Sequence, residues 1–271
     1  MYPEKDYLKV NQELWNQKVN YHIKSDFYNL EGFLKGNNSL NEIEMNLLGD
    51  ISGKSILHLQ CHFGQDTISL GRLGANVTGV DLSDKAIDQA KLLSKKTNID
   101  AHFICCNIYD LPNYLDKKFD IVFTSYGTIG WLPDLNKWAN IIARFLKPNG
   151  KFIFAEFHPI VWMFDNDFEK IKYRYFKSDA IVESEIGTYA DKEAPIKTES
   201  ITWNHSLSEV INSLIKNGLE INKFDEYDYS PYNCFNKTIE IPANKFRIKH
   251  LENKIPMVYS LVATKKFIRN E

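Results

Sequence analysis

The pattern of hydrophobic and polar positions is regular in the middle of the chain and irregular on either side of it. Between residues 55 and 157, short apolar runs alternate with segments of helical periodicity. The apolar runs predict five strands, at 55–60, 76–81, 102–107, 119–125 and 151–157. The periodic segments predict helices at 66–73, 84–96 and 134–145. Strands that alternate with helices are typical of a parallel sheet whose two faces are both covered.

The pattern is looser before and after this region. Residues 1–54 are predicted to be helical and to form an N-terminal cover on the domain. Residues 158–202 mix aromatic and charged side chains without a clean period, so we interpret them as a lid or insertion. We therefore expect two parts, the cover 1–54 and a larger domain, 55–271.

Regularity returns near the C-terminal end. Ser206 and Glu209 fit a capping box, and Gly218 fits a helix stop, so a helix is predicted between them. Strands are then predicted at 221–227 and 257–266.

Composition narrows the function classes. The 271 residues are 44% hydrophobic and 25% charged, with a net charge of -2, which is typical of a soluble globular protein. The sequence has no excess of basic residues, which would indicate nucleic acid as a partner. It also has no apolar run of ~18 residues, which would indicate a membrane span. The polar N-terminus predicts no signal peptide, so we expect a cytoplasmic protein. The four cysteines have no CxxC spacing, so we expect reduced thiols and no metal site.

The stretch "SILHLQCHFGQDT", residues 55–67, predicts a strand that turns tightly into a helix. The free N–H groups of a helix start and the conformational freedom of Gly64 suit a cofactor that approaches the backbone. Asp81 ends the second predicted strand, where an acid commonly binds a ribose diol. A dinucleotide pyrophosphate requires more glycines than this turn has, so the turn favours S-adenosylmethionine.

These motifs together resemble the class I S-adenosylmethionine-dependent methyltransferases over about residues 50–265, and most closely a bacterial small-molecule branch with this "LHLQCHFGQDT" motif. The resemblance implies an α/β fold, a doubly wound, Rossmann-like sheet of seven mostly parallel strands with the last strand antiparallel. The family's acid-x-G-x-G-x-G pattern falls on His58, Gln60, His62 and Gly64. Only the last glycine is present.

The resemblance also implies a set of cofactor-binding residues. Gln60 and His62 would replace backbone contacts by side-chain contacts, and Asp66 would meet the cofactor ammonium. Asp81 would bind the ribose, with Leu82, Asn107 and Ile108 around the adenine. Cys61, Gln65 and Ser125 complete the expected cofactor site.

The candidate catalytic residues are Glu156 and His158, two positions apart at the end of the fifth strand. A carboxylate that orients a histidine is a general-base arrangement, although a structural ion pair is the alternative. His205 is interpreted as a helix-entry hydrogen bond. The expected acceptor pocket is aromatic, formed by Trp15, Tyr21, Tyr28, Tyr126 and Tyr189.

The predicted function is in-line methyl transfer from S-adenosylmethionine, which becomes S-adenosylhomocysteine, to a small-molecule acceptor. Two alternatives stay open: a nicotinamide-dependent oxidoreductase and a non-catalytic module that binds an adenosyl cofactor. We expect a monomer or a homodimer. The sequence does not reveal the acceptor atom.

Overall fold

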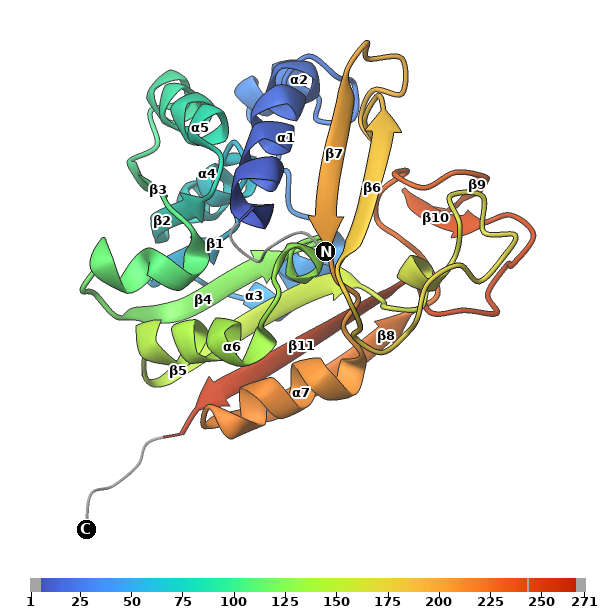
Figure 1. The fold of residues 1–271 in the computed structure, drawn as a ribbon. Helices are drawn as coiled ribbons and strands as arrows, with labels where there is room; N and C mark the ends of the chain where they lie inside the picture. The colour runs from blue at the N-terminus through green and yellow to red at the C-terminus, as the bar shows by residue number, and fades with distance from the viewer. Residues whose placement is uncertain (1–5, 243, 267–271) are drawn as a thin grey trace.

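The computed structural model of the chain describes residues 6–242 and 244–266. Its central sheet has the strand order β3–β2–β1–β4–β5–β11–β8 (Figure 1). The strands are β1 (Ser55–Leu59), β2 (Asn76–Asp81), β3 (Ala101–Cys105), β4 (Phe119–Ser125), β5 (Leu146–Phe157), β8 (Leu219–Tyr227) and β11 (Val258–Lys265).

The strand directions decide the fold class. The strands from β3 to β5 all pair in parallel, whereas β11 is antiparallel to both β5 and β8. The chain moves outward from β1 to β3 and then returns to add β4 on the other side of β1. The predicted doubly wound sheet of seven strands with an antiparallel last strand is therefore confirmed. Ligands bind to such sheets at the reversal point, outside the carboxyl ends of the strands.

Helices cover both faces of the sheet. On one face lie α3 (Glu42–Leu48), α4 (Gln65–Arg72) and α5 (Asp84–Thr97). On the other lie α6 (Leu135–Phe145), α7 (Leu207–Lys216) and the short η1 (Ile108–Asn113). Successive strand residues point to opposite faces, so Ile56 packs with the α3 and α4 side while Leu57 packs with the α6 side.

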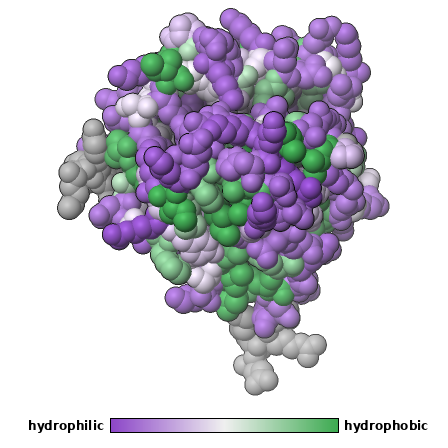
Figure 2. Space-filling view, turned by 90° about the vertical axis from the view of Figure 1, so that its right-hand side faces the viewer, coloured by the Kyte–Doolittle hydropathy of each residue, from purple (hydrophilic) through white to green (hydrophobic). Residues whose placement is uncertain are grey.

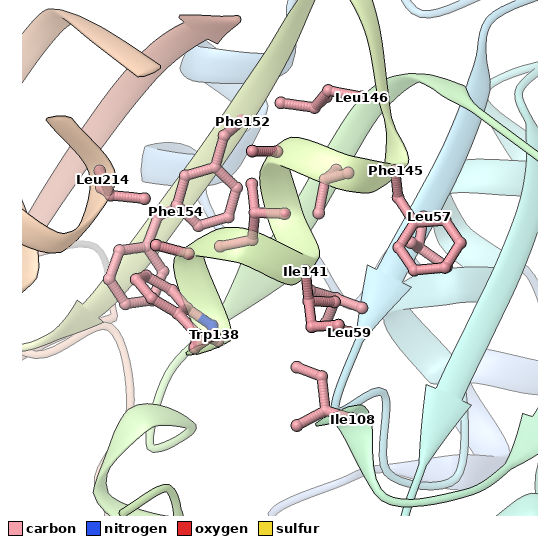
Figure 3. Packing of buried hydrophobic residues seen from close by; sticks show 14 of the residues in the cluster. Leu57, Leu59, Ile108, Trp138, Ile141, Phe145, Leu146, Phe152, Phe154 and Leu214 are labelled. Atoms are coloured by element: carbon pink, nitrogen blue, oxygen red, sulfur yellow. The ribbon is translucent and has the colours of Figure 1, made fainter. Parts of the chain in front are cut away.

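The larger core lies under α6 and α7 (Figure 3). Trp138 of α6 is 0% exposed and packs edge-on against Phe152 of β5, with ring centroids 5.5 Å apart. Phe154, two residues further along the same strand, stands on the same face and also contacts Trp138. Burial of such large side chains is the main stabilising contribution to this half of the molecule.

The cap of α7 differs in one detail from its prediction. Ser206 accepts a hydrogen bond from the Glu209 backbone N–H, as a capping box requires. The Glu209 carboxylate lies 3.1 Å from Nδ1 of His205 instead of closing the box. His205 Nε2 also lies 2.8 Å from the Leu132 carbonyl oxygen, which fits the helix-entry role expected for this histidine.

The cover combines segments that are far apart in the sequence. Helices α1 (Tyr7–His22) and α2 (Leu30–Leu34) precede the sheet, and a hairpin of β6 (Ile181–Ile186) and β7 (Lys197–Thr202) follows β5. In Figure 1, α1 and this hairpin stand side by side above one end of the sheet. The Asn11 side chain both donates to and accepts from the Ile201 backbone, at 2.8 and 3.0 Å, which ties α1 to β7.

Two hairpins were missed by the strand predictions. Residues 181–186 read "IVESEI", and most of these side chains are exposed, so no alternation of buried and exposed positions marks the strand. The same holds for β9 (Thr238–Ile241), which pairs with β10 (Lys245–Ile248). The short segments η2 (Ile129–Trp131) and η3 (Val161–Met163) complete the fold.

Within 6–242 and 244–266, no helix is long and apolar enough to cross a membrane. The face in Figure 2 is mostly hydrophilic, with hydrophobic residues in separate patches.

Candidate active site

The loop after β1 has three residues with left-handed backbone angles, although only one of them is a glycine. Gln60 and His62 have φ angles of 56° and 50°, and Gly64 has 81°. These left-handed values fall on the alternate positions where the family pattern places glycine, so the path of the loop is retained at some conformational cost. The glycine that remains is needed for packing, because a Cβ on Gly64 would lie 2.9 Å from both Ala90 and Phe103.

Asp81 joins this loop to the end of β2. Its carboxylate accepts hydrogen bonds from the backbone N–H groups of His62, at 2.8 Å, and Ser83, at 2.9 Å. Burial raises the pKa of Asp81 to about 6. A carboxylate can accept about four hydrogen bonds, so Asp81 retains capacity for ligand hydroxyls.

A cavity of about 1380 Å³ opens at this edge of the sheet. The structure brings all of the predicted cofactor-binding residues into its wall: Gln60, Cys61, His62, Gly64, Gln65, Asp66, Asp81, Leu82, Asn107, Ile108 and Ser125. Of the predicted acceptor residues, Trp15, Tyr28, Tyr126 and Tyr189 line the same cavity and Tyr21 does not. The cavity is large enough for a nucleoside-sized cofactor and a small acceptor together.

Gln60 presents an unused acceptor. Its Nε2 donates to the Thr128 carbonyl at 2.8 Å, while its Oε1 is buried without a hydrogen-bond partner among the described residues. His58, at the position of the family's acid, lies 2.8 Å from the Thr67 hydroxyl through Nδ1. Burial lowers the pKa of His58 to about 3, so this histidine is neutral and supplies no charge.

Asp66 lies in the first turn of α4, where the helix N-terminus favours a negative charge. The Ser125 hydroxyl donates to it at 3.4 Å. Burial, reinforced by the nearby Glu44 carboxylate, raises the pKa of Asp66 to about 7. Asp66 is thus a carboxyl group that changes its charge near neutral pH.

Glu44 is a site-adjacent residue that the sequence reasoning missed. It is fully buried, and its carboxylate accepts hydrogen bonds from the Tyr126 hydroxyl at 2.8 Å and the Asn41 backbone N–H at 3.2 Å. Burial raises the pKa of Glu44. Asn41 and Glu44 form the capping box of α3, and that spacing was a readable signal.

The predicted pair of Glu156 and His158 is not formed. The Glu156 carboxylate instead accepts the backbone N–H groups of Gly127, Thr128, Ile129 and Phe157 and the Thr128 hydroxyl. Glu156 lines the cavity, but these donors occupy its carboxylate, so it positions the loop after β4.

His158 lies outside the cavity wall. Its Nε2 is 2.9 Å from Oε1 of Glu226 on β8, and its Nδ1 accepts from the Ile160 backbone N–H. The two-residue alternation that suggested a shared face ends with β5 at Phe157, one residue before His158. The expectation that the two side chains act as one base is therefore wrong.

Aromatic side chains form the roof of the cavity. Trp15 of α1 lies edge-on to His62 and to Trp131, with ring centroids 5.2 Å apart in each case. The Tyr28 and Tyr189 hydroxyls are 2.5 Å apart and join the N-terminal segment to the 158–202 segment.

A pair of neutral histidines continues this roof. His22 Nδ1 and His62 Nε2 are 3.0 Å apart. Burial lowers the pKa of His22 to about 2 and that of His62 to about 3, so neither ring carries a charge. The contact therefore links α1 to the β1 loop as a hydrogen bond between neutral imidazoles. His22 was not among the predicted site residues.

Comparisons with known proteins agree with this geometry. Residues 57–154 match the family model described as "Methyltransferase domain". The chain is 24% identical over 230 residues to an uncharacterized methyltransferase of Bacillus subtilis, which covers 80% of this chain and 89% of that protein.

Solved structures share the fold over nearly the whole chain. A S-adenosylmethionine-dependent methyltransferase from Clostridium acetobutylicum has a TM-score of 0.59 at 16% identity and covers 94% of this chain and 100% of that one. Geranyl diphosphate C-methyltransferase from Streptomyces coelicolor has a TM-score of 0.62 at 16% identity and covers 98% of this chain and 100% of that one.

Residues 57–154 therefore form a methyltransferase domain, and the resemblance to the class I S-adenosylmethionine-dependent methyltransferases is confirmed. The family model and the Bacillus subtilis relative thus support methyl transfer, the coarser part of the predicted function.

Proposed function

We propose that this protein transfers a methyl group from S-adenosylmethionine to a small molecule held under the aromatic roof. The observation that carries the proposal is the β1 loop. Its left-handed Gln60 and His62 keep the path of a glycine-rich turn, and Asp81 stands beside it in the cavity wall.

The wall residues fit the parts of the cofactor. Asp81 offers carboxylate oxygens to the ribose hydroxyls, and Ile108 offers an apolar surface to the adenine, beside Leu82 and Asn107. The unpartnered Oε1 of Gln60 and the Asp66 carboxylate are acceptors for the ammonium group. His62 has a smaller part than predicted, because its side chain is hydrogen-bonded to His22.

The bound cofactor supplies a methyl group that its sulfonium already activates. The residues of this chain contribute position and the exclusion of water. Trp15, Tyr28 and Tyr189 close the cavity from above, and Tyr126 lies at the end of β4, held by Glu44. Neither Glu156 nor His158 is available as a base, which favours an acceptor that is nucleophilic without losing a proton first.

The proposal includes a division of the chain into the cover, 1–54, and a catalytic domain, 55–271. The N-terminal cover contributes α1 and α2 to the roof, and the 158–202 segment contributes the β6–β7 hairpin as a lid. Helix α3 packs on the sheet face instead. The cytoplasmic location and the monomeric or homodimeric state remain predictions.

A nicotinamide-dependent oxidoreductase is the weaker alternative. Side chains at positions 60 and 62 stand where a pyrophosphate would need open backbone N–H groups, and the His62 N–H is already bonded to Asp81. The non-catalytic binding module is disfavoured by the space that the cavity leaves beyond the cofactor residues.

The test is ligand-induced stabilisation. S-adenosylhomocysteine should raise the melting temperature in a saturable way, because it binds only the folded chain, and NAD should not. Asp81→Ala should weaken binding by about 1.5–3 kcal/mol, the scale of charge-assisted hydrogen bonds. Asp88→Ala, an exposed acid on α5, is the matched control. Stabilisation by NAD alone would overturn the proposal.

A further inference from the structure

A buried lysine faces the cavity from α1. Lys18 is 5% exposed and lines the cavity wall, and it was not among the predicted site residues. Lysine is almost never this buried without a partner of opposite charge, because burial of an unpaired ammonium is costly.

Lys18 has no ion-pair partner within the described residues. No carboxylate there lies within 4.0 Å of Nζ, and no hydrogen bond satisfies it. Nζ instead lies 5.5 Å from the ring centroid of Trp15 and 5.9 Å from that of Tyr189. Burial lowers the pKa of Lys18, and the charge of Glu185 on β6 offsets this in part. Two aromatic faces and one distant carboxylate leave the ammonium without a direct counter-ion.

The helix places this ammonium above the β1 loop. Trp15, Lys18 and His22 are three and four residues apart, so their side chains share one face of α1. Trp15 and His22, about one turn before and one turn after Lys18, both contact His62. The Trp15 and His62 ring centroids are 5.2 Å apart, and His22 Nδ1 lies 3.0 Å from His62 Nε2. Lys18 is close enough to lower the pKa of His62.

Lys18 is also distinct from the other lysine in the cavity wall. Lys192 is exposed, and its Nζ is hydrogen-bonded to Asn236 at 2.8 Å. Among the described wall residues, Lys18 is thus the buried cation that is free to bind an anion. Asp66 and the Oε1 of Gln60 supply acceptors in the same cavity, so the wall offers complementary groups for a zwitterion.

We infer that Lys18 is the binding residue for a ligand carboxylate in this cavity, and that its ammonium forms the charge-assisted contact that the free protein lacks. The inference rests on the proposed function. The carboxylate has two possible sources, the amino-acid tail of the cofactor and an acidic acceptor. Proximity to the β1 loop favours the cofactor tail.

The experiment compares Lys18→Met, Lys18→Arg and the control Lys9→Met. Lys9 lies on the same helix, but its side chain is 81% exposed and pairs with Glu13. Calorimetry measures the affinity for S-adenosylhomocysteine and for 5′-methylthioadenosine, which has the same nucleoside but no carboxylate. Lys18→Met should weaken S-adenosylhomocysteine about tenfold or more and leave 5′-methylthioadenosine unchanged. Lys18→Arg should retain most of the affinity, and Lys9→Met all of it.

A second measurement separates binding from a structural role. Without ligand, Lys18→Met should have the same melting temperature as the wild type or a higher one, because an unpaired buried charge has been removed. A lysine needed for folding would give a lower one.

A third measurement identifies the source of the carboxylate. Benzoate is titrated into the protein saturated with S-adenosylhomocysteine. If Lys18→Met leaves the cofactor affinity unchanged but abolishes benzoate binding, the site takes the acceptor's carboxylate. If it changes neither affinity, or weakens both nucleosides equally, the inference is wrong. Wild-type binding of S-adenosylhomocysteine tests the proposed function separately.

Discussion

The central sheet and the cover are stabilised in different ways. In the sheet, strand residues such as Phe152 and Phe154 are fully buried against α6, so apolar area dominates. The cover is joined by polar contacts between distant segments, Asn11 with Ile201 and Tyr28 with Tyr189, and by a small apolar cluster that includes Ile201 and Trp203. Each such polar contact contributes only about 1 kcal/mol. From this difference we expect the cover to open more readily than the sheet unfolds.

The largest effect should come from the sheet. Trp138→Ala should lower the free energy of unfolding by about 3–5 kcal/mol, because it leaves a cavity under α6. Trp162→Ala is the control from the 158–202 segment, with a side chain that is 41% exposed, and should cost about 1 kcal/mol or less. Urea denaturation measures both. Equal losses would remove the distinction between the two regions.

Glu156 belongs to β5 and holds the loop after β4, and Trp131 at the end of that loop packs against Trp15 of the cover. Glu156→Gln should lower the free energy of unfolding by about 1–3 kcal/mol, because an amide cannot accept all of the N–H groups that the carboxylate accepts. The affinity for S-adenosylhomocysteine should fall as well. Glu226→Gln on β8 is the control. Unchanged affinity would show that the loop keeps its position without Glu156.

Asp66 gives a pH-dependent test. Its pKa rises from 3.8 to about 7 on folding, so the folded chain holds a proton that the unfolded chain has released between these values. The free energy of unfolding therefore falls as the pH rises through this window. Asp66→Asn should reduce that slope and stabilise the free protein at pH 8 by about 1–2 kcal/mol.

Urea denaturation at pH 5 and pH 8 measures this effect, with Asp88→Asn as the control. Part of the slope should remain, because the pKa of Asp81 is also raised, to about 6. An undiminished slope in Asp66→Asn would show that Asp66 is not the titrating group.

The smallest effect should come from the contact between the cover segments. Tyr189→Phe should change global stability by about 1 kcal/mol or less, yet speed amide hydrogen exchange in 181–202. In the wild type, the amides of residues 181–202 and 6–29 should already exchange faster than those of β1 and β4. This exchange should slow when cofactor and acceptor analogue are bound. Protection of 181–202 equal to that of β1 in the free protein would rule out a lid.

The sequence predicted the central strands β1, β4 and β5 because they are largely buried on both faces. Runs such as "IVF" and "FIF" show this directly, and Ser83 and Gly74 mark the helix ends that the structure has. The hairpin of β6 and β7 carries no such pattern, since its strands are held by backbone pairing near the surface. Local periodicity does not encode a contact of that kind.

The candidate site also has residues that the sequence predicted and residues that it missed. The cofactor residues follow strand ends, so order along the chain was enough to place them in one wall. Lys18, His22 and Glu44 come from the segment before the sheet, and their contacts depend on how that segment folds back. The Glu156 and His158 interpretation was wrong because the alternation was extended beyond the end of the strand.

The hydrogen bonds between Asn11 and Ile201 also set an order of assembly during synthesis. A ribosome delivers the N-terminal helix first, but the strand that Asn11 binds arrives about 190 residues later. At about 5–20 residues per second, that interval is roughly 10–40 seconds. Throughout it the Asn11 amide has no Ile201 backbone to bind, so this side of the helix stays uncovered in the nascent chain. The cavity wall is therefore completed late, and a truncated product that ends before residue 200 lacks the wall residues Ser200, Thr202 and Trp203.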